Sequence, residues 1–193
     1  MSEKSVRLGS FVLLLGLVQF FLLESISTFL YPGYSIANNF VSDLGTGANT
    51  AIIFNSSIVV LGITEIVGGY MLRSYSRFIF VTFTIAGIGA AGVGVVNQDL
   101  VYSIHMIFAL LAFLFASVSS YVSLYKERNA TGVLWAVLGS ISLAALFLSY
   151  PYFDSFYFGI GSGGMERMTM IPNILWAIGF TASLYNKHTE NNR

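Results

Sequence analysis

The sequence contains no cysteine and few charged residues, and both absences limit what the protein can be. Without cysteine there is no disulfide, no thiolate nucleophile and no cysteine-ligated metal. Charged residues make up 9% of the 193 residues, whereas soluble domains carry about 25%. So small a fraction cannot cover the surface of a water-soluble domain. The nine basic and nine acidic residues cancel, so the net charge is zero and gives no indication of a nucleic-acid partner.

Hydrophobic residues take the place of the missing charge. They form 55% of the chain and gather into long apolar runs. Each run approaches the ~20 residues that a helix needs to cross a bilayer. The runs use almost the whole chain, which predicts an all-α fold, a single transmembrane domain of six helices over residues 1–193. The predicted spans are 8–30, 51–72, 78–97, 101–125, 131–150 and 166–185.

Basic residues predict how these spans are oriented. All but one of the nine lie in the terminal segments or in the second and fourth connections: Lys4, Arg7, Arg73, Arg77, Lys126, Arg128, Lys187 and Arg193. The other side holds only Arg167. Because basic loops stay in the cytoplasm, we expect a cell-membrane protein whose N- and C-termini are cytoplasmic. The first, third and fifth loops then face outward.

Polar residues collect near the outward ends of several predicted helices. Ionisable groups at membrane depth are costly unless they face a bundle interior or water, so we expect a polar pocket that opens outward. Candidates for acid–base catalysis are Asp43, His105 and Glu166. Residues expected to bind a ligand are Glu24, Ser42, Asn55, Asp99, Gly163, Gly164, Arg167 and Asn173. Glu65 falls in the inner half of its span, so we expect it to lie apart from the pocket, snorkelling or pairing with Arg73.

Several of these residues also have a purely structural interpretation. Glu24 could pair with Arg167, and His105 could form a hydrogen bond between helices. Asp99 could belong to a tight turn between two helices. Small residues at helical spacing in the third and fourth spans, such as Gly87 and Ala112, predict close packing of helices.

The fifth loop combines aromatic residues with glycines. The aromatic residues between Tyr150 and Phe158 suit a segment at the lipid–water boundary. Glycines then lead into the last predicted helix, where backbone N–H groups and Arg167 are able to hold an anion such as a phosphate headgroup. A flexible glycine-rich entry to the helix is the alternative.

Four short motifs occur in a fixed order along the chain. They are Val41-Ser42-Asp43-Leu44-Gly45, Ile53-Phe54-Asn55, His105, and Gly164-Met165-Glu166-Arg167 before a span with Trp176. In this order they resemble an uncharacterised prokaryotic multi-pass membrane family, domain-of-unknown-function family 998, over most of the chain. They are more distantly similar to the six-span eukaryotic group named after Frag1, DRAM and Sfk1. The resemblance implies a shared architecture and an outward-facing lipid role, but it supplies no reaction.

Three functions stay open at this point. The first is a site that binds or modifies a lipid headgroup, with membrane lipids as partners. The second is a structural or accessory subunit, with a membrane protein or a second copy as partner. The third is a small transporter or proton-coupled carrier that uses Glu24, Glu65 and His105. No cofactor is identified. One membrane histidine is too few for a multi-histidine zinc site, so no metal ligand is named, and a carboxylate-rich site for a divalent ion stays open.

Overall fold

The computed structural model describes residues 3–149 and 158–190, which form six α-helices and one short 3-10 helix. The helices are α1 (Glu3–Leu30), η1 (Val41–Gly45), α2 (Ala51–Met71), α3 (Arg77–Val95), α4 (Tyr102–Glu127), α5 (Ala130–Ser149) and α6 (Gly161–Glu190). The described residues contain no strand, which confirms the all-α prediction. Most of the aromatic segment predicted between Tyr150 and Phe158 lies outside the described residues.

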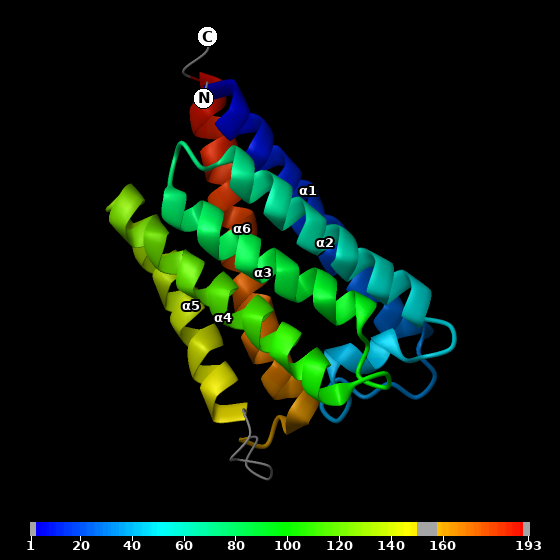
Figure 1. Ribbon diagram of the computed structural model, residues 1–193. Helices are drawn as coiled ribbons and strands as arrows, with labels where there is room; N and C mark the ends of the chain where they lie inside the picture. The colour runs from blue at the N-terminus through cyan, green and yellow to red at the C-terminus, as the bar shows by residue number, and fades with distance from the viewer. Residues whose placement is uncertain (1–2, 150–157, 191–193) are drawn as a thin grey trace.

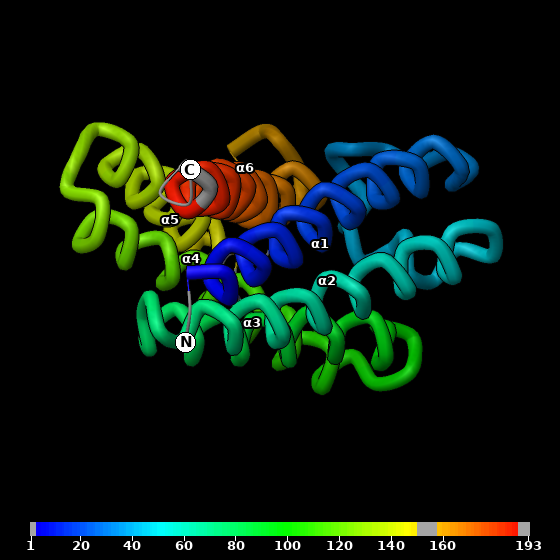
Figure 2. Tube along the Cα trace, turned by 90° about the horizontal axis from the view of Figure 1, so that it is seen from above, coloured from blue at the N-terminus to red at the C-terminus, as the bar shows by residue number. Residues whose placement is uncertain are grey.

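The α-helices form a closed ring. Each contacts its successor along the chain, α6 returns to contact α1, and α4 and α6 also touch across the bundle. Figure 1 shows α1 and α6 meeting at the end where both termini lie, which we call the terminal end. Residues 31–50, including η1, cover the opposite end, which we call the polar end. Figure 2, seen from above, shows α6 almost end-on with α1 beside it.

The surface of the bundle is that of a membrane protein. Helices α1 to α5 are long enough and apolar enough to cross a membrane. Large hydrophobic side chains such as Phe29, Ile52 and Val95 point outward and are exposed, whereas a soluble protein of this size rarely exposes contiguous apolar surface. Helix α6 is not among the five, because polar residues on its buried face, including Asn173, lower its hydropathy.

Helix bounds agree with the predicted spans to within two residues for α2 to α5, and differ at the start of α1 and at both ends of α6. Helix α1 begins at Glu3 rather than at residue 8, and α6 at Gly161 rather than at residue 166. The prediction followed hydropathy, which detects only the apolar part of a helix. Polar first turns extend both helices beyond that part. Of the glycines predicted to lead into the last helix, Gly161, Gly163 and Gly164 are therefore in its first turn, and Gly159 precedes the helix.

Glycines allow α2 and α3 to approach closely. A Cβ added to Gly87 would lie 2.5 Å from the carbonyl oxygen of Gly62, and one added to Gly62 would meet the Gly87 carbonyl in the same way. Between α3 and α4, Gly89 packs in the same way against the backbone of Ala112. The predicted packing of small residues is confirmed, and it draws the helices tightly around the interior of the bundle.

Candidate functional site

Asp43 ties the 3-10 helix to the α3–α4 connection at the polar end. Its carboxylate accepts a hydrogen bond from the Gln98 amide at 2.6 Å, and bonds from the Asn39 side chain and the Phe40 backbone at 3.0 Å each. The Ser42 hydroxyl donates to the other end of Gln98 at 3.1 Å. Both Asp43 oxygens therefore have partners within the protein, and the residue fixes the position of η1 over the polar end of the bundle.

Arg167 fastens residues 31–40 to the start of α6. Its guanidinium pairs with Glu24 at 3.3 Å, which confirms the structural interpretation of these two residues, and donates to the Tyr34 hydroxyl at 2.8 Å. Burial raises the pKa of Tyr34 to about 12, although Arg167 opposes the shift, so the phenol stays neutral. Further donors of the guanidinium reach the carbonyl oxygens of Ile36, Asn39 and Gly163.

The glycines of the first turn of α6 permit a close contact with the chain after α1. The backbone N–H of Gly163 donates to the Ala37 carbonyl at 2.9 Å. A Cβ on Gly163 would lie 2.6 Å from the Ile36 carbonyl oxygen, whereas a Cβ on Gly164 would meet only the Ile160 side chain. Gly161 has a φ of +75°, which favours glycine. The groups expected to hold an anion, namely Arg167 and the N–H of Gly163, are thus engaged within the protein.

Glu166 and His105 lie directly beneath this polar layer. The Val41 backbone N–H donates to one Glu166 oxygen at 2.5 Å. The His105 side chain is 3% exposed, and its Nδ1 lies 2.8 Å from the Val96 carbonyl oxygen. Because a carbonyl only accepts, Nδ1 carries the proton, and in the neutral ring Nε2 is left as an acceptor.

A cavity of about 80 Å³ lies at the centre of the bundle, between η1 and every α-helix except α5. This is room for a few water molecules or a small polar group. Its polar lining residues are Ser42, Glu65, His105, Glu166 and Asn173. Its aromatic lining residues are Phe20, Phe54, Phe83, Phe113 and Trp176. The lining contains no lysine or arginine among the described residues.

Glu65 faces this cavity, and its position corrects the prediction that it lies apart from the other polar residues. Its side chain is 6% exposed, and no residue in the described part of the chain bonds to it or pairs with it. Arg73, the partner considered from the sequence, instead lies 3.7 Å from the centre of the Tyr70 ring. The missed signal is spacing, because Glu65 continues the buried face of Ile58 and Leu61 in α2.

Asn173 belongs to a polar network that joins α4, α5 and α6. Its amide nitrogen donates to the Ser117 hydroxyl at 3.0 Å, and its oxygen accepts from the Trp176 indole at 3.2 Å. Ser117 also contacts the Ser142 hydroxyl at 3.0 Å, and Ser142 donates to the Thr169 carbonyl. Such bonds hold helices together in lipid, and they also fix the wall of the cavity.

The remaining predicted residues lie away from the cavity. The Asn55 amide donates to the Gly45 carbonyl at 2.9 Å, and its side-chain oxygen is buried without a partner. Asp99 is exposed in the connection between α3 and α4. Among the described residues, no three imidazole or carboxylate groups lie close enough together to hold a metal ion. The structure therefore brings Ser42, His105, Glu166 and Asn173 to one cavity and adds Glu65.

Comparison with known proteins gives one match. Neither curated proteins nor solved structures provide a similar relative. The similarity to the Frag1, DRAM and Sfk1 group therefore stays a prediction. The model of one family covers most of the chain, from the middle of α1 to the last turns of α6. The chain belongs to that family, which is described as "Protein of unknown function (DUF998)" and matches residues 14–183.

Proposed function

We propose that this protein binds the polar head of a small amphiphile or lipid in its central cavity. The observation that carries the proposal is Glu65, a buried carboxyl group that faces the cavity without a partner among the described residues. Buried polar groups are almost always hydrogen-bonded, so one without a partner requires an explanation. A ligand that donates a hydrogen bond to Glu65 provides one.

The lining favours a headgroup that carries an amine over one that presents only a phosphate. Two carboxyl groups, Glu65 and Glu166, face the cavity, and no described cation does. Aromatic rings such as those of Phe83 and Trp176 attract cations through their faces. In the neutral ring, the free Nε2 of His105 is a further acceptor. An ammonium group meets acceptors on several sides, whereas a phosphate meets no described positive charge.

The ligand enters from the outside of the cell membrane in this proposal. We infer six spanning helices, with α6 as the sixth, and cytoplasmic termini, because the basic residues concentrate at the terminal end. The polar end then faces outward, and Ser42 and Glu166 lie where the cavity reaches it. If a reaction follows binding, His105 Nε2 and Glu166 are the groups that receive and return a proton. Asp43 and Arg167 hold residues 31–50 in position over the polar end.

Lipid binding by Glu65→Gln tests the proposal. Delipidated protein in mild detergent is titrated with short-chain phosphatidylethanolamine and observed by native mass spectrometry. A hydrogen bond to a charged group is worth enough that we expect the Glu65→Gln variant to bind about tenfold more weakly. Asp99→Asn is the matched control, because this exposed carboxyl lies outside the cavity. Equal binding by Glu65→Gln and wild type would reject the cavity as the site.

A small proton-coupled transporter is the second candidate, and the depth of Glu65 favours it. Glu65 lies in the half of α2 nearer the terminal end, whereas His105 and Glu166 lie near the polar end. Ionisable groups at two depths of one cavity are typical of proton pathways. Liposomes that contain the protein and an internal pH dye distinguish the two: amine-driven pH change that Glu65→Gln abolishes supports transport. Binding without flux supports a binding or modifying site.

The third hypothesis, that the protein is an accessory subunit, is distinguished from the other two by the stability of a variant. It predicts that Glu65→Gln changes the stability of the bundle and leaves lipid affinity as in the wild type. It also predicts a stoichiometric partner, either another membrane protein or a second copy of the chain.

A further inference from the structure

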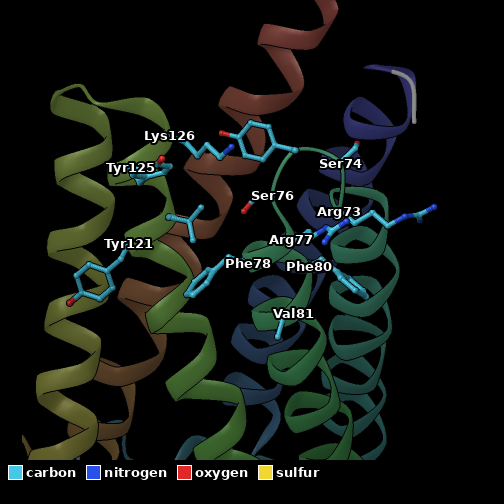
Figure 3. Close-up of a pocket in the computed structure, with 12 residues that line it drawn as sticks. Arg73, Ser74, Ser76, Arg77, Phe78, Phe80, Val81, Tyr121, Tyr125 and Lys126 are labelled. Atoms are coloured by element: carbon cyan, nitrogen blue, oxygen red, sulfur yellow. The ribbon is translucent and has the colours of Figure 1, made fainter.

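A second hollow lies at the terminal end, between α3 and α4 beside the α2–α3 turn. This groove encloses about 1110 Å³ and shares no lining residue with the central cavity. Figure 3 shows Arg73 and Arg77 on one side of it and Lys126 and Tyr125 on the other. The groove is therefore a separate feature that the proposed ligand of the central cavity does not use.

The lining of the groove carries an excess of positive charge. Arg73, Arg77 and Lys126 line it, and the lining includes no aspartate or glutamate. Glu127, which accepts a hydrogen bond from Tyr75, lies outside the lining and pairs with Lys187. Arg77 and Lys126 are exposed, and no described acid forms an ion pair with any of the three. The Lys126 ammonium lies 5.3 Å from the centre of the Tyr75 ring, which orients it at the rim.

Below the cations the groove becomes apolar. Phe78 and Val81 of α3 are each 49% exposed, and Tyr121 of α4 is 38% exposed. Figure 3 shows Val81 and Tyr121 deeper than Lys126 along the helices. At the rim, the Tyr75 hydroxyl donates to Glu127 at 3.4 Å, and burial raises its pKa, so it stays a neutral phenol. The order from rim to floor is cation, aromatic ring and hydrocarbon.

We propose that this groove binds an anionic phospholipid, with its phosphate at Arg77 and Lys126 and an acyl chain against Phe78 and Val81. The sequence of chemistry along the groove matches a phospholipid from head to tail. The excess of positive charge favours an anionic headgroup over a zwitterionic one. The hydrocarbon floor favours a lipid over a soluble phosphate. In the proposed orientation the terminal end faces the cytoplasm, whose leaflet carries the anionic lipids.

Removal of two cations from the rim tests this site. Delipidated wild type and the Arg77→Gln/Lys126→Gln double variant are titrated with short-chain phosphatidylglycerol and phosphatidylcholine, and bound lipids are counted by native mass spectrometry. Each basic residue near an anionic surface contributes about a fivefold gain in affinity. We therefore expect the double variant to lose roughly 25-fold in phosphatidylglycerol affinity, with little change for phosphatidylcholine.

Two further variants keep the test specific. The control Lys4→Gln/Arg128→Gln removes the same charge from the terminal end outside the groove lining, and we expect it to bind phosphatidylglycerol as the wild type does. Val81→Trp keeps every cation but fills the apolar floor, so we expect it to lose the lipid. An equal loss in the control would show general charge attraction and overturn the site. Full binding by Val81→Trp, or displacement of the lipid by millimolar inorganic phosphate, would also overturn it.

Discussion

Replacement of Arg167 by glutamine should strongly destabilise the bundle, because it leaves Glu24 buried without its partner. The two side chains of this ion pair are 11% and 8% exposed, and their charged atoms lie 3.3 Å apart. Breaking a buried pair by removing one partner costs about 3–5 kcal/mol, since the remaining charge is neither solvated nor neutralised. The loss of the donors to Tyr34 and to the carbonyl of Ile36 acts in the same direction.

A double-mutant cycle separates the pair from other effects of the substitution. In Glu24→Gln/Arg167→Gln, two neutral amides replace the two charges, and amides are able to bond to each other. We expect the double variant to be at least 2 kcal/mol more stable than Arg167→Gln alone, roughly half of the single-variant loss. Free energies of unfolding come from SDS titration in mixed micelles, followed by circular dichroism.

The Lys187–Glu127 pair supplies the control for this reasoning. Its atoms are 4.0 Å apart and the Lys187 side chain is 59% exposed, so Lys187→Gln should cost only about 0–1 kcal/mol. The reasoning is refuted if Arg167→Gln costs no more than this control. It is also refuted if the losses of the Glu24 and Arg167 single variants simply add in the double variant.

Three further predictions concern packing, the polar network and pH. Gly62→Val places a side chain against the backbone of Gly87 and should lower the free energy of unfolding by about 1–3 kcal/mol in the same titration. Ser117→Ala removes contacts to Asn173 and Ser142, and should cost about 1 kcal/mol while leaving the helix content unchanged by circular dichroism. The pKa of Tyr34 is raised to about 12 from its ordinary 10, so the unfolded chain loses this proton first. Stability should therefore fall as pH rises from 10 to 12, and Tyr34→Phe should reduce that fall.

The positions of the helices could largely be predicted from the sequence, because apolar length decides where a chain crosses a membrane. The differences lie at the start of α1 and at both ends of α6, where polar turns continue the helix. These turns are held by tertiary contacts, such as the hydrogen bond from the Gly163 N–H to the Ala37 carbonyl. The local sequence around Gly163 does not indicate a hydrogen-bond partner so distant in the chain.

The depth of the candidate site could be predicted from the sequence, but the hydrogen-bond partners of its residues could not. Comparison of depths along the spans placed Ser42, His105 and Glu166 at one level, and all three line the same cavity. Depth could not show that Asp43 bonds to Gln98, because that contact depends on the fold of residues 31–50. Depth also misplaced Glu65. The face of a helix and not the level along it decides what a residue contacts, and α2 turns Glu65 inward.

The zero net charge of this chain conceals two regions of opposite charge, and the fold explains how. Two carboxyl groups, Glu65 and Glu166, line the central cavity, and no described cation lines it with them. The groove at the terminal end has the reverse composition, with Arg77 and Lys126 and no acid in its lining. Charges that served only to hold helices together would be paired, as Glu24 and Arg167 are. A buried carboxyl such as Glu65 is costly without a hydrogen-bonding partner, whereas the exposed cations of the groove attract an anionic headgroup. The two binding proposals therefore assign ligands of opposite charge to the two regions.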